Sequence, residues 1–105
     1  MQSVRIRQAA RLDLVDRYVY LAENAGKTAA ERFFVNAEKS FADLARQPMM
    51  GSPVELGYPE LAGLRKWSIA GFENVLVFYR PYDGGVSIIR VLHAAQDWWR
   101  LFDMR

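Results

Sequence analysis

The fold is decided by residues 64–92, which read LRKWSIAGFENVLVFYRPYDGGVSIIRVL. Three apolar runs, Leu64 to Ile69, Asn74 to Arg80 and Val86 to Leu92, are separated by short polar turns. The second turn contains Asp83-Gly84-Gly85, a combination typical of β-hairpins because glycine accepts the left-handed backbone that tight turns need. Strands joined by hairpins run antiparallel, so this stretch predicts a small antiparallel sheet of three strands.

The residues before this stretch predict one strand followed by a helix. Ser3 to Arg7 alternates apolar and polar side chains, which is typical of a strand with one buried side. From about Gln8 the apolar residues recur at helical spacing, and Gly26 can end that helix. We expect the apolar stripe of this helix to face the core; it consists of Leu12, Val15, Tyr18, Val19 and Ala22.

A second helix is predicted to begin at a capping box, Thr28-Ala29-Ala30-Glu31, and to stop at Pro48. The short turn between the helices makes an antiparallel hairpin, and each helix needs a surface on which to bury its apolar side. For the second helix that side contains Ala30, Phe33, Phe34, Ala37, Phe41 and Leu44.

The expected fold is α+β, in the order β-α-α-β-β-β, with the antiparallel sheet packed against the N-terminal helical hairpin. Residues 48–63 are rich in proline and glycine and predict an irregular connection. Residues 95–102 are amphipathic and predict a short C-terminal helix. A length of 105 residues is typical of one domain, so residues 1–105 are expected to form a single unit.

Composition excludes several classes of site. The chain has no cysteine and one histidine, so disulfides, thiolate metal sites and histidine metal clusters are not expected, and neither is a cofactor. No apolar run approaches the ~20 residues that span a bilayer, and the N-terminus lacks the pattern of a signal peptide. We therefore expect a cytoplasmic protein without a membrane partner.

Charge is uneven along the chain although the net charge is only +2. Residues 1–60 hold eight basic and eight acidic side chains, whereas residues 61–105 hold six and four. A mildly positive sheet suits an acidic partner or a nucleic acid. Charge alone favours the plainer interpretation of a solvated sheet edge.

One catalytic option remains open, a metal-free ribonuclease. His93 would act as acid or base, with Arg65, Arg80 and Arg90 stabilising charge on the phosphate and Tyr79 adding a hydrogen bond. Strand alternation does not place these residues on one face without a bulge. The structural alternatives are a hydrogen-bonded His93 and an ion pair between Arg90 and Asp97.

Aromatic and basic residues also predict a binding surface. Arg65 and Lys66 open an exposed-looking strand, and Trp67 follows them. Trp98 and Trp99 are adjacent, so on a helix they would point about 100° apart, one toward the core and the other toward solvent or a partner.

Several motifs occur here in the order known from one family. They are the helix end Leu44-Ala45-Arg46-Gln47-Pro48, the GLRKW strand from Gly63, the VLVFYR strand from Val75, the Asp-Gly turn, and RVLHAAQD from Arg90. Together they cover nearly the whole chain, which resembles the RelE/ParE superfamily of toxins from type II toxin-antitoxin systems.

The two branches of that superfamily imply different functions. RelE-like members are ribosome-dependent mRNA endoribonucleases that typically use several lysines and arginines and often a tyrosine near the C-terminus. This chain has three lysines and no tyrosine after Tyr82. ParE-like members inhibit DNA gyrase without evident catalysis of their own. His93 and Asp97 match the His-small-small-Arg-Asp pattern of the ParE branch, although Gln96 replaces its arginine, so the ParE-like branch is favoured.

The resemblance also implies partners. It predicts a hetero-oligomer with a cognate antitoxin, ParD-like or other, whose disordered C-terminal segment folds onto the toxin. DNA gyrase is the expected target, and the ribosome with mRNA is the alternative. The residues expected to contact the antitoxin or the target are Arg65, Lys66, Trp67, Tyr79, Arg80, Arg90 and Trp98.

Overall fold

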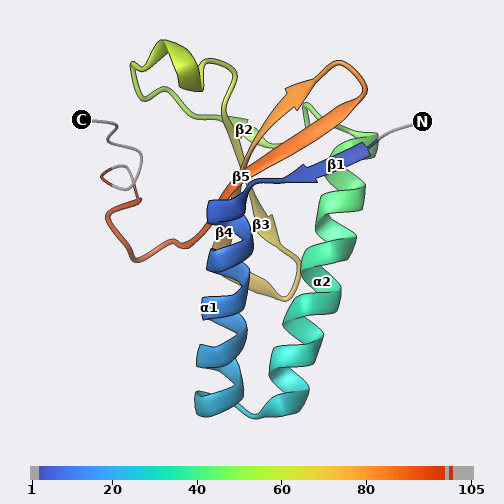
Figure 1. The fold of residues 1–105 in the computed structure, drawn as a ribbon, viewed down its shortest axis with the longest axis vertical. Coiled ribbons are helices and arrows are strands. Elements are labelled where there is room, and N and C mark those ends of the chain that lie inside the picture. The colour runs from blue at the N-terminus through green and yellow to red at the C-terminus, as the bar shows by residue number, and fades with distance from the viewer. Residues whose placement is uncertain (1–2, 99, 101–105) are drawn as a thin grey trace.

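A computed structural model describes residues 3–98 and residue 100 of the chain (Figure 1). A single 3₁₀ turn at Pro59–Leu61 interrupts the connection between the helices and the main strands. The other elements are, in order, β1 (Ser3–Ile6), α1 (Gln8–Asn24), α2 (Lys27–Arg46), β2 (Ser52–Pro53), β3 (Arg65–Ile69), β4 (Phe72–Tyr82) and β5 (Gly85–His93).

The sheet has five strands in the order β1-β5-β4-β3-β2. The predicted hairpins β3–β4 and β4–β5 are antiparallel, as expected, and β1 lies at an edge. The predicted antiparallel sheet is confirmed in part: the sheet is mixed, because β1 pairs with β5 in parallel, with Ser3 opposite Gly85 and Ile6 opposite Ile88. The two-residue strand β2 was not predicted either; it pairs with the start of β3.

The helical hairpin covers one face of the sheet, and the main core lies between the two layers (Figure 1). Fully buried members of this core include Phe33 from α2, Val77 from β4 and Ile88 from β5. A second, smaller core occupies the other face, where Phe78 and Leu92 pack against the connection before β3. Both faces of the central strands are therefore covered.

The predicted phase of α1 was wrong. Ala10 and Leu14 are its buried residues, whereas Leu12 and Val15 are 57% and 58% exposed. Apolar residues occur in adjacent pairs along this helix, so more than one stripe fits helical spacing, and sequence does not say which stripe the sheet will cover. In α2 the predicted stripe is confirmed, except that Phe34 is exposed.

The helix boundaries also differ from the prediction. Helix α1 ends at Asn24, and α2 begins at Lys27 with Gly26 as its N-cap at a φ of +98°. Gly26 does supply a left-handed backbone, but at the start of α2. The prediction of a capping box at Thr28 is wrong, because the N-cap of α2 is Gly26 and no side chain caps this helix.

Among the described residues after β5, no α-helix is found where a C-terminal helix was predicted. After β5 the described chain makes a turn, and Trp98 folds back onto Phe78 of β4, with 5.0 Å between ring centroids. Residues 99 and 101–105, which belong to the same prediction, lie outside the described residues. Among the helices that are described, none has the length and hydropathy needed to cross a membrane.

Candidate functional site

The three arginines of the proposed ribonuclease site lie in separate places, and each is held by the protein itself. Arg65 donates to the carbonyl oxygens of Gly51 and Met49, and the second bond is 3.3 Å long. Arg80 donates to the carbonyl oxygen of Glu60, within the 3₁₀ turn. Arg90 binds a carboxylate on α1. The structure does not bring these cations together around one point.

Tyr79 is fully buried, with 0% of its surface exposed. Its hydroxyl donates to the carbonyl oxygen of Pro48 at 2.7 Å and accepts the N–H of Gly51 at 2.8 Å. Burial raises the pKa of this phenol, while the Gly51 hydrogen bond and the charge of Arg65 act in the opposite direction. Tyr79 therefore anchors the connection after α2 to strand β4, a position that does not fit the predicted contact with a partner.

The other predicted contact residues are distributed over both faces. The Lys66 ammonium lies 5.5 Å from the ring centroid of Trp98, on the face opposite the helices. This cation–π contact orients both side chains. Trp67, on β3, is about one-third exposed, which leaves part of its ring open to a partner.

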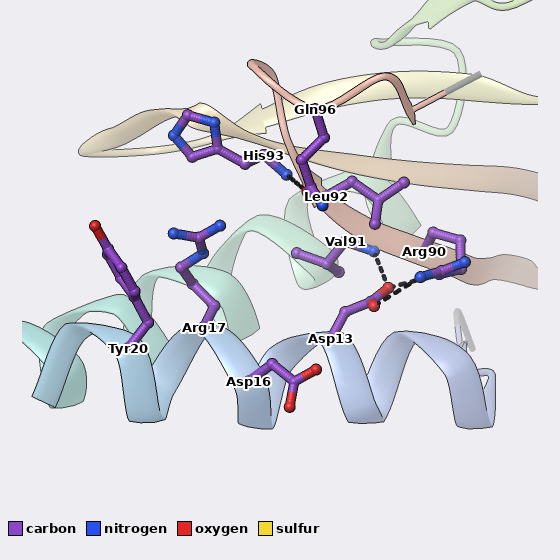
Figure 2. Close-up of a pocket in the computed structure, with 9 residues that line it drawn as sticks. All are labelled: Asp13, Asp16, Arg17, Tyr20, Arg90, Val91, Leu92, His93 and Gln96. Atoms are coloured by element: carbon purple, nitrogen blue, oxygen red, sulfur yellow. Dashed lines mark hydrogen bonds and ion pairs between the residues drawn. The ribbon is translucent and has the colours of Figure 1, made fainter. Parts of the chain in front are cut away.

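Two of the candidates do share one site, a hollow of about 620 Å³ between α1 and the end of β5 (Figure 2). Strand β1 ends at Ile6, so beyond Ile88 no strand in the described part of the chain pairs with the outer edge of β5, and α1 lies there instead. The pairing of β4 with β5 also skips Ile89, a bulge that re-aims the following residue. The hollow is lined by Asp13, Asp16, Arg17, Tyr20, Arg90, Val91, Leu92, His93 and Gln96.

Asp13 forms the centre of this site. Its carboxylate accepts hydrogen bonds from Nε and Nη2 of Arg90, at 2.8 and 2.9 Å, and from the backbone N–H of Val91 at 2.9 Å (Figure 2). The hydrogen bonds to Asp13 raise the pKa of Arg90 above its ordinary value. The predicted ion pair of Arg90 with Asp97 was wrong; Asp97 lies 3.8 Å from Arg100 instead.

His93 is fixed at the rim of the hollow. Its Nδ1 accepts the N–H of Ala95 at 3.0 Å, and its own backbone N–H donates to Oε1 of Gln96 at 2.8 Å. Because Nδ1 accepts a hydrogen bond, the proton of the neutral ring is on Nε2. The nitrogen that remains available is therefore a donor, which suits ligand binding better than proton abstraction.

A second candidate site is an apolar groove of about 520 Å³ on the helical hairpin. Phe34 and Val35 are 45% and 61% exposed, and Tyr18 packs edge-on against Phe34 with 6.5 Å between centroids. Exposed apolar patches of this kind mark surfaces that bind other proteins. The groove is lined by Leu14, Val15, Tyr18, Glu31, Phe34 and Val35.

Sequence reasoning missed much of both sites. The groove residues Val15 and Phe34 were assigned to the core, and Asp13, Arg17 and Tyr20 were not singled out. The adjacent apolar pairs Leu14-Val15 and Phe33-Phe34 were the available signal, since one helix cannot bury both members of each pair against the same sheet.

Comparison with known proteins finds a matching family model and solved structures of similar fold. A family model described as "ParE toxin of type II toxin-antitoxin system, parDE" matches residues 4–98. No curated protein matches the chain. A solved structure of a chromosomal ParDE system from P. aeruginosa is 19% identical, with a TM-score of 0.72, over 89% of this chain and 96% of that chain. A toxin-antitoxin complex, RelBE2 from Mycobacterium tuberculosis, is 28% identical, with a TM-score of 0.57, over 90% and 93%.

Proposed function

The chain belongs to the ParE toxin family of type II toxin-antitoxin systems, and on that premise we propose that it inhibits DNA gyrase by binding and is neutralised by a cognate antitoxin. The observation that carries a binding mechanism is the use of Arg65, Arg80 and Arg90 in contacts within the protein. A ribonuclease needs its cations gathered around one phosphate. Here two of the three are held by backbone carbonyls at different places on the sheet.

The apolar groove on the hairpin is the surface we assign to the antitoxin. Its exposed members Val15, Phe34 and Val35 come from both helices, a layout that accepts the apolar face of an amphipathic helix. Two solved structures to which this chain is similar are described as a ParDE toxin-antitoxin system and as a toxin-antitoxin complex. A ParD-like antitoxin whose disordered segment folds along this groove would give a hetero-oligomer in the cytoplasm.

The test is a gyrase assay with purified chain, gyrase from the source organism, relaxed plasmid and ATP. We expect loss of supercoiling and accumulation of protein-linked broken DNA, and both effects should disappear when the antitoxin is added first. Normal supercoiling in the presence of a chain that still arrests growth would rule out gyrase as the target.

The observation that favours the ribonuclease alternative is that His93 and Arg90 line the same hollow. Translating ribosomes supplied with a defined mRNA give the direct test. We expect intact mRNA. Cleavage that falls by ~10²-fold or more in His93→Ala, the usual loss for a missing acid or base, would support the enzyme instead.

A further inference from the structure

Three hydrogen-bond donors meet at the rim of the α1/β5 hollow. Arg17 and Tyr20 lie one turn apart on α1, and His93 faces them from the end of β5. Figure 2 shows the guanidinium, the phenol hydroxyl and the imidazole ring gathered on the same side of the hollow. The same three residues also border an adjoining hollow of about 360 Å³ beside the β3–β4 turn, so the cluster sits between two open spaces.

Each donor is oriented by the protein but keeps capacity for a ligand. The Arg17 guanidinium lies over the ring of Tyr20, 5.0 Å from its centroid, and has no ion pair among the described residues. Tyr20 is about half exposed. Nδ1 of His93 accepts the N–H of Ala95, and Nε2 has no hydrogen-bond partner among the described residues. Pre-oriented donors lose less conformational entropy when they bind.

The carboxylates nearby do not use up these donors. Asp13 is occupied by Arg90 and Val91. Asp16 points away from the cluster in Figure 2. In the adjoining hollow, Glu73 accepts the N–H of Gly71 at 2.8 Å. Among the described residues, no carboxylate accepts a hydrogen bond from Arg17, from the hydroxyl of Tyr20 or from Nε2 of His93, so the cluster is open to a carboxylate of a binding partner.

We propose that this cluster receives one carboxylate side chain, an aspartate or glutamate, of the protein that the toxin targets. The inference rests on the proposed function, because it names a contact within that binding event. A carboxylate matches the planar N–H pair of a guanidinium and accepts further bonds from a hydroxyl and an imidazole. Arginine and tyrosine are also the residues that most often dominate binding energy at protein interfaces.

The charge of the hollow favours a protein side chain over nucleic acid. Its lining has two aspartates and two arginines, whose charges cancel. Affinity for a phosphate backbone comes mainly from uncompensated cations. A site without net charge whose hydrogen-bond donors are held in place instead favours one acceptor group that fits the positions of those donors.

The first test measures the affinity of the full-length chain for gyrase. Arg17→Gln should weaken binding roughly tenfold or more, since a hydrogen bond to a charged group contributes about 1.5–3 kcal/mol. Tyr20→Phe, which removes only the hydroxyl, should weaken it by a smaller factor. Arg11→Gln makes the same charge change on an exposed part of α1 outside the hollow and should have little effect. Equal losses for Arg17→Gln and Arg11→Gln would overturn the proposal.

A second test does not depend on gyrase. The chain is titrated with acetate and, separately, with inorganic phosphate, at constant ionic strength set with chloride, while backbone amide NMR signals are followed. We expect saturable shifts at Val91 and His93 with acetate, and their loss in Arg17→Gln. No response to acetate, or tighter binding of phosphate, would refute the carboxylate site. If wild type binds acetate here but does not bind gyrase, the proposed function fails and the site stands.

Discussion

Asp13 on α1 and Arg90 on β5, 77 positions apart in the sequence, are joined by two hydrogen bonds of 2.8 and 2.9 Å. The same carboxylate accepts the N–H of Val91. This N–H lies on the outer edge of β5, beyond the point where the pairing with β1 ends. The Asp13 side chain thus supplies a hydrogen-bond acceptor to the unpaired edge of β5 and holds the helical hairpin against the sheet. It also lines the same hollow as Arg17 and His93.

Asp13→Ala should lower the free energy of unfolding by about 2–4 kcal/mol, because it leaves a partly buried guanidinium and a backbone N–H without their acceptor. Urea unfolding followed by circular dichroism gives the value. Asp16→Ala, which removes the same charge one turn away, should change stability by less than about 0.5 kcal/mol. Equal effects of the two substitutions would show that the pair does not join helix to sheet.

Tyr79→Phe should destabilise the fold by about 1–3 kcal/mol near neutral pH, because the Gly51 N–H and the Pro48 carbonyl lose their partner. The pH dependence follows from burial, which raises the folded-state pKa of Tyr79 above its ordinary value of 10.0. The folded state therefore holds this proton more tightly, and the stability it contributes is present below about pH 10 and lost as pH rises through the folded pKa. Urea unfolding between pH 8 and pH 11 should show a steeper loss for wild type than for Tyr79→Phe. Parallel curves would contradict this assignment.

Gly85→Ala should disrupt the pairing of β1 with β5. A Cβ at this position would lie 2.0 Å from the carbonyl oxygen of Ser3, a backbone atom that cannot move without breaking the parallel ladder. We expect a loss of a few kcal/mol in unfolding free energy and faster amide exchange at Val4 and Ile6. Gly57→Ala is the control: its Cβ meets nothing within 4 Å, although its φ of +81° costs about 1–2 kcal/mol. A loss no greater than that of the control would mean that β1 tolerates the side chain.

Val15→Asp should weaken antitoxin binding by roughly thirtyfold or more, the effect of removing a contact worth about 2 kcal/mol and burying a charge in an apolar groove. Leu12→Asp adds the same charge to the same helix at a residue that is equally exposed but does not line the groove. Isothermal titration calorimetry with the antitoxin, after circular dichroism confirms folding, compares the two. Similar affinities for both variants would place the antitoxin elsewhere.

The hairpin strands and both helices could be predicted because their signals are local. The Asp83-Gly84-Gly85 turn, the continuous apolar run of β4 and the helical spacing of Phe33, Ala37, Phe41 and Leu44 each depend on neighbours within a few positions. The family resemblance drew on the same local motifs, and the match over residues 4–98 confirms it.

The site residues were predicted less well because their roles depend on distant partners. The local sequence of Arg65 and Arg80 predicts cations available to a partner, whereas in the folded chain both donate to backbone carbonyls that folding brings close. Tyr79 is fully buried because folding packs the connection after α2 over it. The residues next to Arg17 and Tyr20 in the sequence give no sign that His93 lines the same hollow.

The sequence by itself determined the order of the first strand, the two helices and the three hairpin strands, the β4–β5 turn, the core side of α2 and the family. Only the tertiary structure decided which side of α1 is buried, that β1 runs parallel to β5, and that the bulge at Ile89 directs Arg90 to Asp13. The physical reason is that backbone propensity and turn chemistry act over a few residues. Burial and hydrogen bonding are decided by whichever surface the packed chain brings into contact.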